Sequence, residues 1–284
     1  MKKILFILVA ILMPLASIAD ERGWCGKNVS YSYVEATQTL TISGSGAMTD
    51  YTLKSNSPWY SYKDEIANLI IEGGLTKIGD YAFFACKSLK SVVIPNSVMS
   101  IGEDAFYSCI SLTSVNIPNG VVNIGNHAFG SCSSITSIAI PSSVTNLESS
   151  FTGCCGLELI NIENGNPVYD SRENCNAIIE TSTNTLILGC KNTIIPNSVV
   201  TIGNAAFGGC IGLRSITIPS SVLSIENVAF SGCVELMSVN IPNSVKSVGW
   251  SVFSGCTSLT SITIPNSVTN ISNSVFSGCT NLTS

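Results

Sequence analysis

A unit of 23 residues repeats along most of this chain. Its first half reads Leu-x-Ser-(Val/Ile)-x-Ile-Pro-Asn-x-Val in the copies that begin at Leu89, Leu112, Leu236 and Leu259. Its second half reads Ile-Gly-x-x-Ala-Phe-x-x-Cys, as in residues 101–109 and 202–210. A period of this length is the sequence signature of an architecture in which similar units stack on one another.

Apolar residues recur at positions 1, 4, 6, 10, 13, 17, 18 and 21 of the unit, counted from the leading Leu. Positions 4 and 6 alternate with polar positions, so this stretch predicts a short strand with one buried face. Proline at position 7 ends the strand because it has no N–H to donate. The Ala-Phe-x-x-Cys segment has near-helical spacing and predicts a helical or 3₁₀ turn that places Phe and Cys in the core.

One unit cannot bury its apolar side chains alone, and stacked neighbours supply the missing contacts. The sequence therefore predicts a repeat solenoid, mainly β, built from short strands and short helical or 3₁₀ turns around one continuous apolar interior. The rungs of this stack begin at Ile66, Leu89, Leu112 and Ile135, and then at Leu213, Leu236 and Leu259.

The first residues have the layout of a cleavable signal peptide, which we assign to residues 1–19. Lys2 and Lys3 precede an apolar run from Ile4 to Leu12, and small residues follow before Asp20. The run is too short to remain as a membrane span. We therefore expect an exported chain, either secreted or held at the cell surface, with no membrane span after cleavage.

The rest of the chain divides into four parts. Residues 20–65 predict an N-terminal β-strand module that caps the open end of the solenoid. Residues 66–156 form a first block of four rungs, of which the fourth is one residue short and lacks the Ala-Phe pair. Residues 157–189 are irregular and contain a β-hairpin around residues 181–184, which either projects from the stack or covers a seam in it. Residues 190–284 form a second block that ends within a repeat.

These units resemble the BspA-like class of leucine-rich repeats found in bacterial surface proteins. The resemblance covers residues 20–284 and includes the segments 25–29 and 40–48, and an interrupted unit at 166–180 of the kind common in gut Bacteroidales. It implies a leucine-rich-repeat solenoid and a role in adhesion to host matrix proteins, other bacteria or epithelium. The proline at position 7 departs from general leucine-rich repeats, so their horseshoe curvature is not implied.

Most cysteines are expected to be buried thiols. Stacked rungs place equivalent side chains about 4.8 Å apart and parallel, whereas a disulfide needs converging Cβ atoms about 3.8 Å apart. Cys175 and Cys190 flank the predicted hairpin and are the one candidate disulfide. The cysteines at repeat position 21 are Cys86, Cys109, Cys132, Cys154, Cys210, Cys233, Cys256 and Cys279.

The sequence offers little for catalysis, metals or nucleic acid. His127 is the one histidine, it falls in a predicted turn where solvent exposure is the default, and no second histidine can complete a relay or a metal site. Lys and Arg number 13 against 18 Asp and Glu, so a phosphate backbone is a poor partner. We predict no enzymatic activity, no cofactor and no metal.

The outward positions of the strand carry small hydroxyl and amide side chains that can hydrogen-bond an extended polymer along its length. The alternative is that these side chains merely keep a flat sheet soluble.

We predict a scaffold that binds an extracellular protein or glycan non-covalently. A structural spacer or a truncated repeat array is the second hypothesis. The oligomeric state is open. The candidate contact residues are Lys90, Val93, Thr113, Asn116, Thr136, Arg214, Thr217, Met237, Asn240, Thr260 and Thr263.

Overall fold

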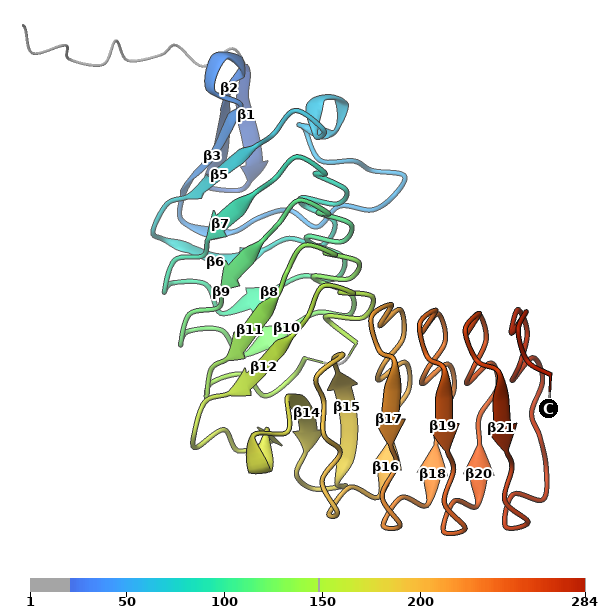
Figure 1. Ribbon diagram of the computed structural model, residues 1–284. Helices are drawn as coiled ribbons and strands as arrows, with labels where there is room; N and C mark the ends of the chain where they lie inside the picture. The colour runs from blue at the N-terminus through green and yellow to red at the C-terminus, as the bar shows by residue number, and fades with distance from the viewer. Residues whose placement is uncertain (1–20, 148, 284) are drawn as a thin grey trace, which may run out of the picture.

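The structure is a computed structural model that describes residues 21–147 and 149–283, so the predicted signal peptide lies outside the described residues. Short strands and turns make up a β-solenoid, which confirms the predicted fold class. Figure 1 shows its rungs in two blocks, one running down the view and the other running across it, so that the molecule is shaped like an L.

Two long sheets and one two-stranded sheet form the first block, which includes the N-terminal module. One sheet begins with three antiparallel strands and continues with parallel ones. Its strands are β1 (Glu21–Gly26), β2 (Val29–Val34), β3 (Thr39–Gly44), β5 (Asn68–Ile71), β7 (Ser91–Val93) and β9 (Ser114–Asn116). The parallel pair β11 (Ser137–Ile140) and β12 (Leu159–Ile162) is a separate sheet that lies next to β9. The other long sheet is formed by β4 (Gly46–Ala47), β6 (Leu75–Ile78), β8 (Ser100–Ile101) and β10 (Asn123–Ile124).

The second block has counterparts of both long sheets, but its antiparallel strands extend the counterpart of β6, β8 and β10. Its first sheet also begins with three antiparallel strands, β13 (Tyr169–Asp170), β14 (Ala177–Glu180) and β15 (Thr185–Gly189), and continues with the parallel strands β16 (Thr201–Ile202), β18 (Ser224–Ile225) and β20 (Ser247–Val248). Its second sheet holds β17 (Ser215–Thr217), β19 (Ser238–Asn240) and β21 (Ser261–Thr263). The β14–β15 hairpin thus lies between the blocks, because β15 pairs with β16 and β14 packs against β12.

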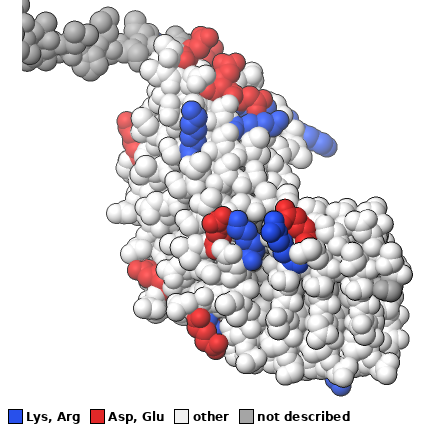
Figure 2. Space-filling model, viewed as in Figure 1, with Lys and Arg blue, Asp and Glu red and all other residues white. Residues whose placement is uncertain are grey.

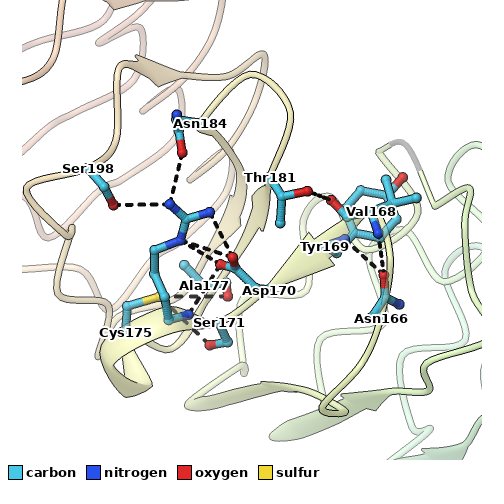
Figure 3. A network of polar contacts seen from close by, with 11 residues as sticks. Asn166, Val168, Tyr169, Asp170, Ser171, Cys175, Ala177, Thr181, Asn184 and Ser198 are labelled. Carbon is cyan, nitrogen blue, oxygen red and sulfur yellow. Dashed lines mark hydrogen bonds and ion pairs between the residues drawn. The ribbon is translucent and has the colours of Figure 1, made fainter.

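The hairpin is held by a polar network around Arg172, which lies in a 3₁₀ segment (Arg172–Asn174). The Arg172 guanidinium pairs with the Asp170 carboxylate at 2.7 Å and donates to Asn184 Oδ1 at 2.8 Å and Ser198 Oγ at 3.3 Å (Figure 3). On the other side of the network, Asn166 Oδ1 accepts the N–H of Tyr169 at 2.8 Å. The Arg172 contacts tie the hairpin, through Asn184, to Ser198 in the next rung of the second block.

The Ala-Phe-x-x-Cys segments differ from the predicted helical turns. Positions 16 and 20 of the unit have positive φ, as at Asp104 (50°) and Ser108 (56°). Alternate N–H groups donate to the next rung, as Phe83 does to Ala105 (2.7 Å), while the others donate three residues back, as Cys86 does to Phe83 (3.2 Å). A helix needs negative φ angles throughout, so these segments are not helical. They are turns whose main chains are hydrogen-bonded from rung to rung in a ladder.

The phenylalanines of these turns stack into ladders along the solenoid axis. The ladder of the first block starts at Trp59, which directly precedes the 3₁₀ segment Tyr60–Tyr62 and donates its indole N–H to the Ala82 carbonyl at 2.8 Å. Neighbouring ring centroids lie 5.0 to 6.0 Å apart. The stacked rings are Trp59, Phe83, Phe106, Phe129 and Phe151 in the first block and Phe207, Phe230, Phe253 and Phe276 in the second.

The apolar interior is divided, whereas the sequence predicted one continuous core. One hydrophobic cluster extends from Cys25 to Cys190 and the other from Cys175 onward. No ring stacking joins Phe151 to Phe207 among the described residues; Gly189 of the hairpin lies against the Phe207 ring instead, so close that an added Cβ would fall 2.2 Å from it. The inserted hairpin therefore ends one stack and starts another.

The short fourth rung keeps its place in the ladder although it lacks the Ala-Phe pair. Ser150 occupies the alanine position and is buried, and Phe151 stacks on Phe129 at 5.2 Å. The Ser150 hydroxyl donates to the Leu147 carbonyl at 2.6 Å, which satisfies its polar group inside the core. A rung can therefore lose one residue without leaving the stack.

The cysteines at repeat position 21 are packed against the phenylalanine ladder. Six of their thiols donate to the phenylalanine carbonyl of the preceding rung, as Cys132 does to Phe106 at 3.1 Å. Burial raises the pKa of the Cys132 and Cys256 thiols to about 12. All twelve cysteines are free thiols in this structure. Cys175 and Cys190 belong to different hydrophobic clusters, and their pairing stays a prediction.

Candidate binding surfaces

The first candidate surface is the outward side of the strands β7, β9 and β11 in the first block and β17, β19 and β21 in the second. We call it the sheet face. Parallel pairing in register aligns residues 23 positions apart, so Thr217 lies beside Asn240 and Asn240 beside Thr263. Val93 and Asn116 are neighbours in the same way in the first block. Because the register is set by the inward Val and Ile side chains, a one-residue slip would expose the core. The core therefore fixes the outward side chains in straight files.

All eleven candidate contact residues are exposed on or beside the sheet face. Val93 and Met237 are large apolar side chains among them, 71% and 52% exposed. Thr113 Oγ1 donates to the Lys90 carbonyl at 3.3 Å, so this hydroxyl is partly engaged by its own scaffold. The structure brings these residues into two groups, Lys90 to Thr136 on the first block and Arg214 to Thr263 on the second.

Charged groups are sparse on the visible side of the molecule. Figure 2 shows one group of acidic and basic side chains where the two blocks meet, another at the N-terminal end of the first block, and a wide uncharged area over the second block. Two ion pairs belong to the region where the blocks meet: Lys191–Glu158 at 2.6 Å, which links residues on either side of the hairpin, and Arg214–Glu235 at 3.0 Å. Arg214 is thus already paired, and such exposed pairs contribute little to stability.

A second candidate surface lies at the inner corner of the L, where the turn segments of the two blocks meet (Figure 1). A groove of about 510 Å³ opens there. Sequence reasoning missed it because it is lined by residues from both blocks. We call it the corner groove, and its lining includes Leu53, Tyr81, Phe84, Asp104, Tyr107, His127, Gly153, Ala205, Gly208, Val228 and Ser231.

Aromatic side chains line the first-block wall of the corner groove. Phe84 and Tyr107 stack at 5.4 Å, and His127 meets the Tyr107 ring edge-on at 6.2 Å. His127 is therefore half-buried against an aromatic ring, whereas the sequence suggested a solvated residue. The Asp104 carboxylate, which hydrogen-bonds the Tyr81 hydroxyl, raises the pKa of Tyr81 to about 12.

Neither surface resembles a metal site. Within residues 21–147 and 149–283, no three His, Cys, Asp or Glu side chains lie close enough together to hold an ion. In the same part of the chain, the helical segments are all too short or too polar to cross a membrane.

The comparisons with known proteins match this architecture. The family model of the BspA type leucine rich repeat region fits residues 54–177 and 184–284, with six copies, which is well over half of the 284 residues. The chain belongs to the BspA-type leucine-rich repeat family. The resemblance inferred from the repeat unit is therefore confirmed. Leucine-rich repeat solenoids are typically non-catalytic scaffolds that bind protein partners.

Solved structures of bacterial leucine-rich repeat proteins are similar to this BspA-type chain. A leucine-rich repeat protein from Eubacterium ventriosum is 27% identical with a TM-score of 0.74, covering 93% of this chain and 77% of that one. A leucine rich cell surface protein from Faecalibacterium prausnitzii is 25% identical with a TM-score of 0.52, covering 94% and 95%. A leucine-rich repeat protein from Bacteroides ovatus is 25% identical with a TM-score of 0.52, covering 90% of this chain and 69% of that one. A comparison with curated proteins finds no match.

Proposed function

We propose that this chain is exported and acts at the cell surface as a scaffold that binds an extracellular protein or glycan through its sheet face. The description of the Faecalibacterium relative as a cell surface protein supports the location. The residues before Asp20 support export, because they have the pattern of a signal peptide.

The observation that carries the binding proposal is the alignment of exposed, mostly uncharged donors and acceptors in files across successive rungs. Parallel strands lie about 4.8 Å apart, so the file of Thr217, Asn240 and Thr263 offers a hydrogen-bonding group at regular short intervals. An extended polymer can contact several rungs at once. Individually weak contacts then add up because the later ones form within a complex that already exists.

The sheet face is tested by placing three lysines in one file. The variant Thr217→Lys, Asn240→Lys, Thr263→Lys is expected to bind any ligand of the unmodified chain at least about tenfold more weakly than that chain does. This factor corresponds to ~1.4 kcal/mol of binding free energy. The reason is that the substitutions remove the hydroxyl and amide groups of one file and place long cations on three neighbouring rungs. Binding of the mature chain and the variant to matrix proteins, mucins and glycans is measured by surface plasmon resonance.

A matched control places three lysines on the same rungs but outside the strands, at the exposed positions after each proline. This control is Ser220→Lys, Asn243→Lys, Asn266→Lys, and it is expected to bind as the unmodified chain does. Equal binding by the sheet-face variant and the unmodified chain would remove the sheet-face proposal. Absence of binding by all three proteins would favour the structural spacer.

A further inference from the structure

The corner groove has two chemically different walls. The first-block wall presents the aromatic side chains of Phe84 and Tyr107, whereas the second-block wall presents Gly208, Val228 and Ser231. Leu53 borders the groove from the loop before Trp59 and is 64% exposed. A volume of about 510 Å³ lies in the range typical of ligand pockets.

The main-chain hydrogen-bond ladder of the turns is broken at this groove. In the preceding rung, the N–H of Ser131 donates to the Thr152 carbonyl at 2.9 Å. The equivalent bond from Gly153 to Gly208 is not formed, and neither the Gly153 N–H nor the Gly208 carbonyl has another hydrogen-bond partner among the described residues. Both residues line the groove, so it contains an unpaired main-chain donor and an unpaired main-chain acceptor.

The aromatic wall favours a peptide over a sugar. A sugar ring binds best to the open face of an aromatic ring, but these faces already cover one another: Phe84 and Tyr107 stack with 9° between their planes. Tyr81 lies 5.6 Å from Phe84 at a tilt of 37°, His127 lies beside Tyr107, and a Cβ added to Gly130 would fall 2.8 Å from the Tyr107 ring. The ring edges are what remains for a ligand, and an apolar side chain packs well against edges.

The charge of the groove favours a basic partner. Asp104 is its one carboxylate, and Glu103 is next to Asp104 on the exposed surface. No Lys or Arg lines the groove among the described residues, although Lys54 follows Leu53 in the loop. A lysine or arginine near Asp104 would therefore meet an opposite charge, and an acidic residue would be disfavoured.

We propose that the corner groove binds an extended peptide that carries a large apolar side chain beside a basic residue. The peptide main chain bonds to the Gly153 N–H and the Gly208 carbonyl, its apolar side chain packs against the edges of Phe84 and Tyr107, and its basic residue lies near Asp104. This site is separate from the sheet face and does not depend on the function proposed for that face.

The test uses a variant that fills the groove with a side chain the fold already accommodates. Ser231 is at position 19 of its unit, where Tyr107 stands in the first block, so Ser231→Tyr is expected to fold and to occupy the groove. Ser254→Tyr is the matched control, because Ser254 has the same repeat position one rung further and does not line the groove. Thermal unfolding of both variants checks that they are folded.

A phage-displayed library of random linear peptides is selected on the mature chain, and enriched peptides are synthesised for fluorescence anisotropy. We expect enrichment of a large apolar residue beside Lys or Arg, at least about tenfold weaker binding to Ser231→Tyr (~1.4 kcal/mol), and unchanged binding to Ser254→Tyr. The three-lysine sheet-face variant is expected to retain peptide binding, so the two proposals fail separately.

Three results would overturn the peptide site. The first is selection without this pattern, or without any enrichment. The second is equal binding of the enriched peptides to Ser231→Tyr and the unmodified chain. The third is binding of an oligosaccharide panel that Ser231→Tyr abolishes while no peptide is enriched, which would make the groove a glycan site.

Discussion

Phe106→Ala is expected to lower the free energy of unfolding by about 3 to 5 kcal/mol, the usual cost of removing a fully buried phenylalanine. Phe106 is buried and stacks on Phe83 at 5.1 Å and on Phe129 at 5.2 Å, so the substitution opens a cavity between two rungs. Denaturant unfolding followed by circular dichroism measures the change.

Phe84→Ala is the control for this substitution. Phe84 is a half-buried ring on the outer side of the turns and lies outside the core clusters. Its removal is expected to cost less than half as much. Equal losses in the two variants would mean that the Phe83–Phe106–Phe129 stack does not hold the first block together.

Raising the pH above 9 is expected to destabilise the chain steeply. Burial raises the pKa of the Cys132 and Cys256 thiols from the ordinary 9.0 to about 12, and that of Cys109 and Cys233 well above 9.0. Between these values the unfolded chain loses thiol protons that the folded chain keeps. Each such thiol therefore lowers the free energy of unfolding by roughly 1 to 1.5 kcal/mol per pH unit, with no loss below pH 9.

The pH dependence is measured by denaturant unfolding at several pH values from 7 to 11, with a reductant present. The double variant Cys132→Ala, Cys256→Ala is expected to lose stability less steeply with pH, because two of the ionising groups are gone. Phe84→Ala, which removes no ionising group and leaves the buried thiols in place, is expected to keep the original slope. A double variant with an unchanged slope would show that these thiols are not held protonated in the core.

Much of the fold was predictable because the repeat sets both the period and the buried face. The alternation around Val92 and Ile94 indicates a strand with one buried side, and Pro95 marks where it ends. The turn segments were mispredicted because Ala105, Phe106 and Cys109 have helix-like spacing. Sequence spacing reports which side chains point inward, but it does not report the positive φ angles that place them there.

The division into two cores and the corner groove were beyond sequence reasoning for a different reason. Both depend on how β15 docks onto β16 and on Gly189 lying against Phe207, which are contacts between units that the repeat pattern does not describe. The sheet face is the opposite case, because its outward positions follow directly from strand alternation. What these residues bind depends on a partner, and no pattern in the chain encodes its identity.

The stacking of successive units in register is the claim on which both binding proposals depend. Ser224 Oγ and Ser247 Oγ lie 2.8 Å apart on neighbouring rungs, and Asn270 has the same repeat position one rung further. Two double variants are compared. The first carries Ser224→Cys together with Ser247→Cys, and the second carries Ser224→Cys together with Asn270→Cys. Each is treated with dibromobimane, a short reagent that fluoresces strongly only when it joins two thiols. Stacking in register predicts strong fluorescence for the first pair and little for the second, whose rungs are about 9.6 Å apart. Equal fluorescence of the two pairs, or none from the first, would contradict it.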